Sequence, residues 1–263
     1  TDGGAAEARD ALAQLALLHF DLPPHCPPGA AQGSYPHRLA QLLARVRGPA
    51  GGAAGRALDI GCGVGGVSFE LACAYGEVVG VDLSADFIKA ANAMRSEGQL
   101  AVEAVEEGNV RSQRVLKPPA GGGERGRIVF RHMDGMCLAP DLGEFDCVVV
   151  ANVLTHMAAP RSCLGRMAGV KGLLKVGGLL LVADTFDWSP AATPQGSWIG
   201  GYYGSGEGGA GRGQPVGSRE ALADILGGDY VLVGEEDVAC GMPLSRRRVD
   251  LRVLDATVWR RIK

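Results

Sequence analysis

The sequence is poor in aromatic residues, which make up 5% of the chain, and it has no excess of basic residues. Its 26 lysines and arginines are outnumbered by 29 acidic residues, which argues against a protein that holds nucleic acid by electrostatics alone. No apolar run reaches the roughly 18 residues of a transmembrane helix, and the first residues lack the pattern of a secretory signal. We therefore expect a cytoplasmic protein without a membrane partner.

Paired cysteine motifs are also missing. The chain has 7 cysteines, none spaced C-x-x-C, and most lie in apolar runs such as residues 145–150. Buried, reduced thiols are therefore favoured over disulfides or a metal site. His132, Asp134 and Cys137 lie close in sequence but have no recognised ligand spacing, so no metal is expected.

What the chain does have is apolar material and glycine: 46% of its residues are hydrophobic and 41 are glycine. At 263 residues, it is long enough for one large domain over residues 1–263. Residues 4–19 and 35–46 have helical spacing on either side of a Pro-rich break. They predict a helical cap over residues 1–50.

From residue 56 onward, short apolar segments alternate with helical ones. Residues 98–126 have no clean period and are interpreted as an insertion or loop, and residues 185–217 form a Gly-rich segment with two tryptophans. Ser84 is expected to cap the helix that follows it. Strands are expected at residues 56–60, 77–82, 127–133, 145–151, 178–183, 229–238 and 248–260, and helices at 65–75, 85–95, 160–174 and 218–226.

Repeated strand–helix units with apolar strands predict a parallel sheet covered by helices on both faces. The last two strands have no helix between them, so we expect them to pair as an antiparallel hairpin at one edge. The predicted fold is α/β and Rossmann-like, with a seven-stranded, mostly parallel sheet. Its ligand crevice should lie at the carboxyl ends of the strands.

The glycine-rich segment after the first predicted strand fits two cofactor motifs. Gly61, Gly63 and Gly66 satisfy G-x-G-x-x-G, and Asp82 follows about 20 residues later, where the ribose-binding acid of a dinucleotide site belongs. With Gly65, the same segment also satisfies the D-x-G-x-G-x-G pattern of S-adenosylmethionine (SAM) enzymes. Glycines allow close approach of a ligand, and the helix amides behind them favour an anionic group.

Three features favour SAM over a nicotinamide dinucleotide. Asp59 places a carboxylate beside the loop, where it would repel a pyrophosphate and attract the amino group of SAM. Asp134 ends a strand and is placed to accept from the adenine amino group, and the terminal hairpin is typical of methyltransferases. Asp82 is expected to accept from both ribose hydroxyls, while Leu83 and Met136 sandwich the adenine. Alternatively, Asp82 caps the helix that follows it, and Met136 belongs to the hydrophobic core.

Longer segments resemble known families. Residues 57–62 and 68–72 resemble class I SAM-dependent methyltransferases. Other segments are similar to the methyltransferase domain of ovothiol biosynthesis, the 4-mercaptohistidine N1-methyltransferases, and this likeness spans nearly the whole chain. These segments are Leu18-His19-Phe20 with Tyr35-Pro36, the loop Ser197–Tyr203, and the ending Ala256–Arg261. The chain departs from that family at residues 155–157 and in the basic run 245–248.

The resemblance implies transfer of the SAM methyl group to a ring nitrogen of 5-thiohistidine, giving ovothiol A. In that family the domain follows a sulfoxide synthase in one polypeptide, so the chain is expected to be fused to, or cut from, such a partner. The alternatives are another small-molecule methyltransferase, a non-catalytic SAM-binding regulatory domain, and a nicotinamide oxidoreductase.

Such a reaction needs alignment and control of the imidazole tautomer more than a strong base. His156 and Asp184 are the candidate proton acceptors, with helix-start and loop-cap roles as the alternatives. Arg38 or one of the arginines 246–248, first among them Arg246, is expected to bind the substrate carboxylate, with a solvated strand edge as the alternative for the arginine run.

Trp198 and Tyr202, which lie among glycines, are expected to form an aromatic lid. Tyr35 is expected to contact the methionine part of SAM or the substrate. The residues expected to bind SAM are Tyr35, Asp59, Gly61, Cys62, Gly63, Gly65, Asp82, Leu83, Asp134, Gly135, Met136 and Asn152.

Overall fold

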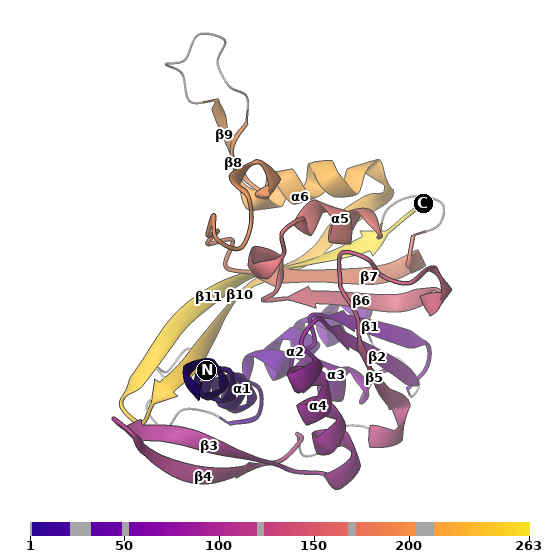
Figure 1. Cartoon of the computed structure of the whole chain (residues 1–263). Coiled ribbons are helices and arrows are strands. Elements are labelled where there is room, and N and C mark those ends of the chain that lie inside the picture. Colours follow the sequence, from indigo (N-terminus) through magenta and orange to yellow (C-terminus); the bar gives the residue numbers. More distant parts are fainter. Residues whose placement is uncertain (1, 22–32, 49–52, 120–123, 168–171, 204–212) are drawn as a thin grey trace.

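The computed structural model describes residues 2–21, 33–48, 53–119, 124–167, 172–203 and 213–263 (Figure 1). The α-helices are α1 (Asp2–Phe20), α2 (Tyr35–Arg47), α3 (Gly66–Leu71), α4 (Ala85–Glu97), α5 (Pro160–Gly165) and α6 (Ser218–Leu226). The strands are β1 (Arg56–Ile60), β2 (Glu77–Asp82), β3 (Leu100–Glu107), β4 (Val110–Leu116), β5 (Ile128–His132), β6 (Phe145–Ala151), β7 (Leu174–Asp184), β8 (Gly201–Tyr203), β9 (Gln214–Val216), β10 (Tyr230–Ser245) and β11 (Arg248–Arg261). Short 3₁₀ helices are η1 (Arg125–Arg127), η2 (Pro140–Leu142), η3 (Leu154–His156), η4 (Gln195–Ser197) and η5 (Gly227–Asp229).

A sheet of seven strands runs through the described part of the chain in the order β10-β11-β7-β6-β1-β2-β5. The strands from β7 to β5 are parallel. β11 pairs antiparallel with β7, and β10 pairs antiparallel with β11 at the edge. This confirms the predicted Rossmann-like sheet and its terminal hairpin.

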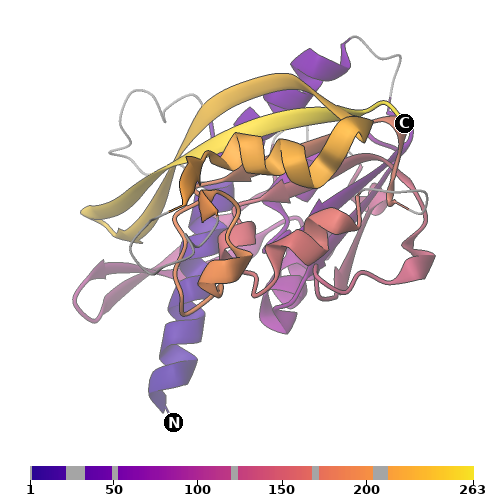
Figure 2. The same cartoon turned by 90° about the horizontal axis from the view of Figure 1, so that it is seen from above.

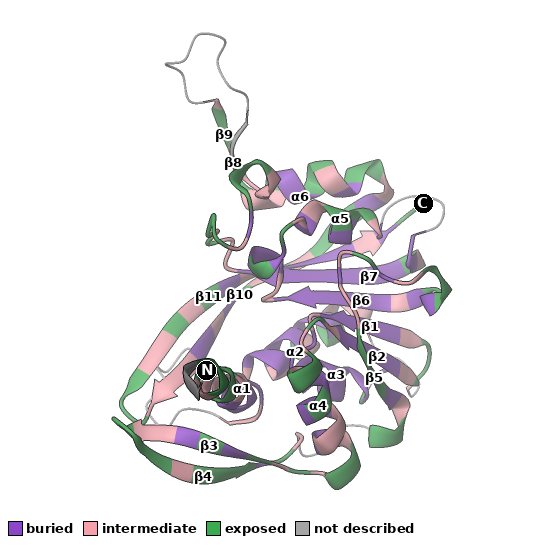
Figure 3. Cartoon of the chain, viewed as in Figure 1, coloured by how far each residue is buried: buried purple, intermediate pink, exposed green. Residues whose placement is uncertain are grey.

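The helices cover both faces of this sheet, with α1 to α4 on one face and α5 and α6 on the other (Figures 1 and 2). Side chains of a strand alternate between the faces, so a strand buried on both must be apolar throughout. In β6, Cys147 and Val149 pack toward α1 to α4, whereas Val148 and Val150 pack toward α5 and α6. β1, β6 and β7 are accordingly buried along most of their length (Figure 3). No helix in the described ranges is long and apolar enough to span a bilayer.

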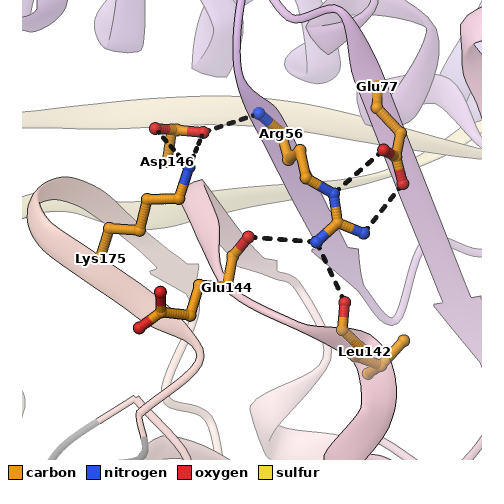
Figure 4. Close-up of polar contacts among 6 residues, drawn as sticks. All are labelled: Arg56, Glu77, Leu142, Glu144, Asp146 and Lys175. Carbon is orange, nitrogen blue, oxygen red and sulfur yellow. Dashed lines mark hydrogen bonds and ion pairs between the residues drawn. The ribbon is translucent and has the colours of Figure 1, made fainter.

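The amino ends of the central strands are tied together by ion pairs (Figure 4). Arg56 at the start of β1 donates through Nε and Nη2 to Glu77, at 3.0 and 2.9 Å. The Asp146 carboxylate accepts from the Arg56 amide at 2.8 Å and from Lys175 Nζ at 2.9 Å. Burial alone would raise the pKa of Asp146, but these donors outweigh it and hold the pKa below its ordinary value. The charged side chains at this end of the sheet are therefore paired with one another.

The prediction of a loop over residues 98–126 is wrong, because much of this segment is the β3–β4 hairpin. Val102 and Ala104 are buried while Ala101 and Glu103 beside them are exposed, which is the pattern of a half-buried strand. The strands are joined at Gly108 and Asn109, and Gly108 has a φ of 58°. A Gly-Asn pair between alternating segments is a hairpin signal.

Other elements also differ from their predicted bounds; for example, the helix expected at residues 65–75 ends at Leu71. The helix expected at residues 160–174 ends at Gly165, and β7 begins at Leu174; glycines at 165 and 172 disfavour a continuous helix there. The terminal hairpin is longer than expected and bends over α1, toward the β3–β4 hairpin (Figure 1). At its turn, the Arg246 amide donates to the Val105 carbonyl at 3.1 Å. α1 is thus enclosed between the two hairpins.

Candidate active site

The predicted cofactor residues gather at the carboxyl ends of the parallel strands. β1 lies between β2 and β6, so the order in which the chain adds strands to the sheet reverses at β1. Ligands of open α/β sheets bind at such a point. The loops after β1, β2, β5 and β6 meet there and hold the glycine loop, Asp82, Asp134 and Asn152.

The glycine loop is held in a conformation that only glycine adopts readily. Gly61, Gly63 and Gly65 have φ values of 72°, 54° and 92°. A Cβ on Gly61 would lie 2.4 Å from a methyl of Val153, and one on Gly63 would lie 2.8 Å from a methyl of Leu15. The Gly61 amide donates to the Val81 carbonyl at 2.8 Å, which fixes the loop to β2. The loop is therefore preformed.

Asp82 and Leu83 follow β2 and face this loop. The Asp82 carboxylate accepts from the Gly63 amide through Oδ2 and from the Ser84 amide through Oδ1, both at 2.8 Å. Each carboxylate oxygen has a second lone pair, so both remain able to accept from a ribose diol. Ser84, not Asp82, caps α4, since its hydroxyl accepts from the Phe87 amide. Leu83 is 64% exposed and offers the apolar surface that an adenine ring would cover.

The segment after β5 closes the other side of the predicted adenine site. Asp134 Oδ1 accepts from the Met136 amide at 2.8 Å, and Met136 Sδ accepts from the Ala159 amide at 3.2 Å. A Cβ on Gly135 would lie 2.8 Å from Ile60, so this turn also needs glycine. Met136 is only partly buried at the edge of the core, which is compatible with both of its predicted roles.

Asp59 is buried under the glycine loop, with 2% of its surface exposed. Burial raises its pKa to about 7; a hydrogen bond from Ser68 Oγ at 2.6 Å opposes this rise, and the Asp82 charge adds to it. An ammonium group beside it would favour the carboxylate, whereas a pyrophosphate would be repelled. The charge of this site therefore suits the amino group of SAM.

The first amide of α3 is not free to bind the predicted anion, because it donates to His19 of α1. The Gly66 amide donates to His19 Nδ1 at 2.9 Å, and a Cβ on Gly66 would lie 2.6 Å from that nitrogen. The helix amide that a pyrophosphate would need is thus already used. The sequence gives no local signal for this contact, since His19 and Gly66 lie on different helices.

The prediction of Asp184 as a proton acceptor is not supported, because its carboxylate is fully buried and satisfied by the chain itself. It accepts from the Leu154 amide at 2.9 Å, the Thr155 hydroxyl at 3.0 Å and the Thr185 amide at 2.8 Å. These bonds fix the turn after β6, in which Asn152 has a φ of 53°. Asp184 therefore shapes the loop that carries the site residues.

His156 ends η3, two residues beyond Leu154, and its side chain is exposed. Within the described residues its ring has no hydrogen-bond partner. It thus remains available as a proton acceptor in this loop, in contrast to Asp184.

The side chain of Trp198 is held by contacts within its own loop. Its Nε1 donates to the Thr193 carbonyl at 2.9 Å, and its ring stacks on Trp188 with centroids 6.5 Å apart. Thr193 in turn donates to the Met157 carbonyl at 2.7 Å, which joins this loop to the segment that carries His156. The side chain of Tyr202 and residues 204–212 lie outside the described residues.

The two arginines expected to hold the substrate carboxylate lie on different elements. The Arg38 guanidinium is buried against β10, where it donates to Glu236 and to the Asp237 carbonyl, both at 3.1 Å. Arg246 lies in the turn of the terminal hairpin, beside Val105 of β3. The Arg38 contacts engage its guanidinium, so its predicted role is not supported. The Arg246 contact is made by its backbone amide, and substrate binding by its guanidinium stays a prediction.

Comparisons with known proteins agree with this geometry. Residues 58–180 match the family model described as "Methyltransferase domain". The "probable methyltransferase ltbC" of Aspergillus luteorubrus is 28% identical over 137 residues, or 49% of this chain. The match spans 40% of the length of that relative.

Among solved structures, the N-methyltransferase NodS from Bradyrhizobium japonicum matches with a TM-score of 0.50 and 20% identity, over 86% of this chain and 95% of that chain. The cyclase SpnF matches with a TM-score of 0.50 and 19% identity, over 88% and 73% of the two chains. These likenesses show the fold. The family match covers the segment that carries the glycine loop, Asp82 and Asp134. Residues 58–180 therefore form a methyltransferase domain on this fold, with SAM as its cofactor.

Proposed function

We propose that this protein is an N-methyltransferase that uses SAM to methylate a ring nitrogen of 5-thiohistidine (4-mercaptohistidine), giving ovothiol A. The observation that carries SAM-dependent chemistry is the preformed glycine loop between the exposed Leu83, Asp82 and the buried Asp59. The substrate is supported by the resemblance of three segments to the methyltransferase domain of ovothiol biosynthesis.

Two of these segments, the ending 256–261 and the loop 197–203, are connected to β7. Residues 256–260 of β11 pair with β7, and the Thr257 hydroxyl donates to the Val182 carbonyl at 3.2 Å. The loop with Trp198 follows β7 along the chain, and its Thr193 is bonded to the segment after β6. This arrangement supports a substrate site on the β6–β7 side of the glycine loop.

SAM, when bound, supplies an electrophilic methyl group on a sulfonium centre. The chain must align a nucleophile with it, an effect worth up to roughly 7–11 kcal/mol. A neutral imidazole already has one lone pair, so no strong base is required to activate it. We assign His156 to accept the proton on the other ring nitrogen, which fixes the reactive tautomer and takes up that proton after transfer.

The test is mass spectrometry of the protein incubated with SAM and, separately, 5-thiohistidine, histidine, simple thiols and simple amines. We expect 5-thiohistidine to gain one methyl group, with product NMR placing it on the ring nitrogen nearer the side-chain attachment. Methylation of another compound alone would favour a different small-molecule methyltransferase. Binding of S-adenosylhomocysteine (SAH) without any product would favour a regulatory domain.

We further propose a cytoplasmic reaction supplied by a sulfoxide synthase, which makes the carbon–sulfur bond of the substrate. The cysteines within the described residues are all free thiols, which supports a reducing compartment. A coupled assay with a sulfoxide synthase of that pathway, together with a carbon–sulfur lyase and a thiol reductant that convert its sulfoxide product to the thiol, would test this supply. Failure of the resulting thiol to be methylated would argue against it.

A further inference from the structure

A cavity of about 200 Å³ lies between α1, the β3–β4 hairpin and the turn of the terminal hairpin. These three elements are far apart in sequence and meet where the two hairpins enclose α1 (Figure 1). Among the described residues, none of those that line the cavity belongs to the loops after β1, β2, β5 or β6. The cavity is therefore separate from the candidate active site.

α1 stands between this cavity and the glycine loop. The residues of α1 and its end that line the cavity recur at helical spacing, at positions 10, 13, 14, 17 and 21. Another face of α1 carries His19, which accepts from the Gly66 amide at 2.9 Å and lies 2.8 Å from Tyr35 Oη through its second ring nitrogen. A ligand in the cavity can therefore be bound at the same time as the cofactor.

The wall of the cavity is largely apolar. Leu17 of α1 and Ala104 of β3 are 8% and 7% exposed, and Pro243 and Val249 of the terminal hairpin line it from the other side. Such a wall favours an apolar group of a ligand. The volume is below the roughly 300–1,000 Å³ of pockets for drug-sized ligands, so the ligand must be small.

The cavity also has positive charge that the chain itself does not use. Arg114 of β4 lies opposite Val102 in the hairpin register, and because Val102 is buried toward α1, the side chain of Arg114 is on that face too. Its guanidinium has no acceptor within the described residues. Arg246 of the hairpin turn also lines the cavity, and its guanidinium is likewise without an acceptor in that part of the chain. A carboxylate is the group that an unpaired guanidinium binds best.

Asp21 provides the opposite charge at the cavity. Its carboxylate accepts no hydrogen bond from the described residues. The other acids that line the cavity differ: Asp10 is paired with Arg111 at 2.6 Å, Glu106 accepts from a β4 hydroxyl, and Glu103 is exposed on the outer face of β3. Asp21 is thus placed to accept from an ammonium group.

We propose that this cavity binds a free α-amino acid with an apolar side chain, a ligand that has both charges and an apolar group. Arg114 binds its carboxylate, Asp21 binds its ammonium, and its side chain packs on Leu17 and Ala104. The site is distinct from those of the cofactor and the methyl acceptor.

The experiment is an NMR titration of the full chain with L-phenylalanine, with and without saturating SAH. We expect saturable amide shifts centred on Ala104 and Val105, with the same affinity in both titrations. Glycine has both charges but no apolar side chain, so it should bind at least about tenfold more weakly.

Two analogues separate the charges, since 3-phenylpropionate lacks the ammonium and 2-phenylethylamine lacks the carboxylate. Arg114→Gln should weaken phenylalanine and 3-phenylpropionate by about 10- to 100-fold and leave 2-phenylethylamine unchanged. Asp21→Asn should weaken phenylalanine and 2-phenylethylamine to the same extent and leave 3-phenylpropionate unchanged. Arg248→Gln is the matched control, because Arg248 belongs to the same hairpin turn as Arg246 but does not line the cavity. It should change none of the three affinities.

The absence of saturable shifts would overturn the proposal. So would shifts centred on Asn152 and His156, or competition with SAH, because either would place the amino acid at the candidate active site. Equal losses in Arg114→Gln and Arg248→Gln would overturn it as well, since they would show a general effect of charge. None of these measurements depends on methyl transfer, so failure of the proposed function would leave this result standing.

Discussion

Asp59→Asn should raise stability and lower cofactor affinity at the same time. The pKa of Asp59 is about 7 in the folded chain, against an ordinary value of 3.8. The folded state therefore binds the proton more tightly than the unfolded state does, and stability falls as pH rises from about 4 to about 7. A pKa difference of about 3 units corresponds to about 4 kcal/mol in the free energy of unfolding. Wild type loses this stability by pH 8, whereas the Asp59→Asn variant keeps it because its amide stays neutral.

Denaturant unfolding from pH 4 to pH 8 measures the first effect. Asp59→Asn should match wild type near pH 4 and exceed it at pH 8, while its Oδ1 still accepts from Ser68. Asp146→Asn, at the amino end of β6, is the control with the opposite sign. Because the pKa of Asp146 is lowered in the folded chain, its contribution is present above that pKa, and its loss should destabilise at pH 8.

Calorimetry at pH 8 measures the second effect. Asp59→Asn should weaken SAH by about 10- to 100-fold but leave 5′-methylthioadenosine unchanged, because that nucleoside has no ammonium group. Wild-type affinity for SAH should rise between pH 6 and pH 8 as Asp59 ionises. A variant that is less stable than wild type at pH 8, or that binds SAH equally well, would refute this reasoning.

Three further substitutions separate the other roles. Asp82→Ala should weaken SAH and 5′-methylthioadenosine alike, by about tenfold or more in calorimetry, because both carry the ribose; an effect on SAH alone would contradict ribose binding. Trp198→Ala should reduce the methyl-transfer rate by about tenfold with little change in SAH affinity, whereas equal losses would indicate a folding role. Asp184→Ala should lower the free energy of unfolding by about 3 kcal/mol, since several buried donors lose their acceptor; unchanged stability would restore Asp184 as a catalytic candidate.

The fold was predictable because its signals are local. Strands buried on both faces must be continuously apolar, and residues 56–60, 77–82 and 145–151 were placed with the bounds that the structure shows. The missing helix before the last strand indicated the antiparallel edge. The glycine positions were also readable, since φ values near those of Gly61 and Gly63 are rarely adopted by other residues.

The contacts between distant segments were not predictable from local patterns. Arg38 looked available for a substrate, but only the fold shows its guanidinium against Glu236 on β10. Asp184 ends a strand as catalytic acids do, yet its carboxylate oxygens accept hydrogen bonds from the turn after β6. His19 capping α3 is a third case, because the contact joins residues 47 positions apart. The β3–β4 hairpin is different, because the Gly-Asn pair between its strands is a local hairpin signal.

The most direct test of the central claim is a calorimetric titration of the wild-type chain with SAH and, in parallel, with a nicotinamide dinucleotide. We expect one SAH site per chain and no heat from the dinucleotide, because the Asp59 carboxylate would repel a pyrophosphate and the Gly66 amide already donates to His19. Saturable binding of the dinucleotide without binding of SAH would contradict a SAM site at this glycine loop.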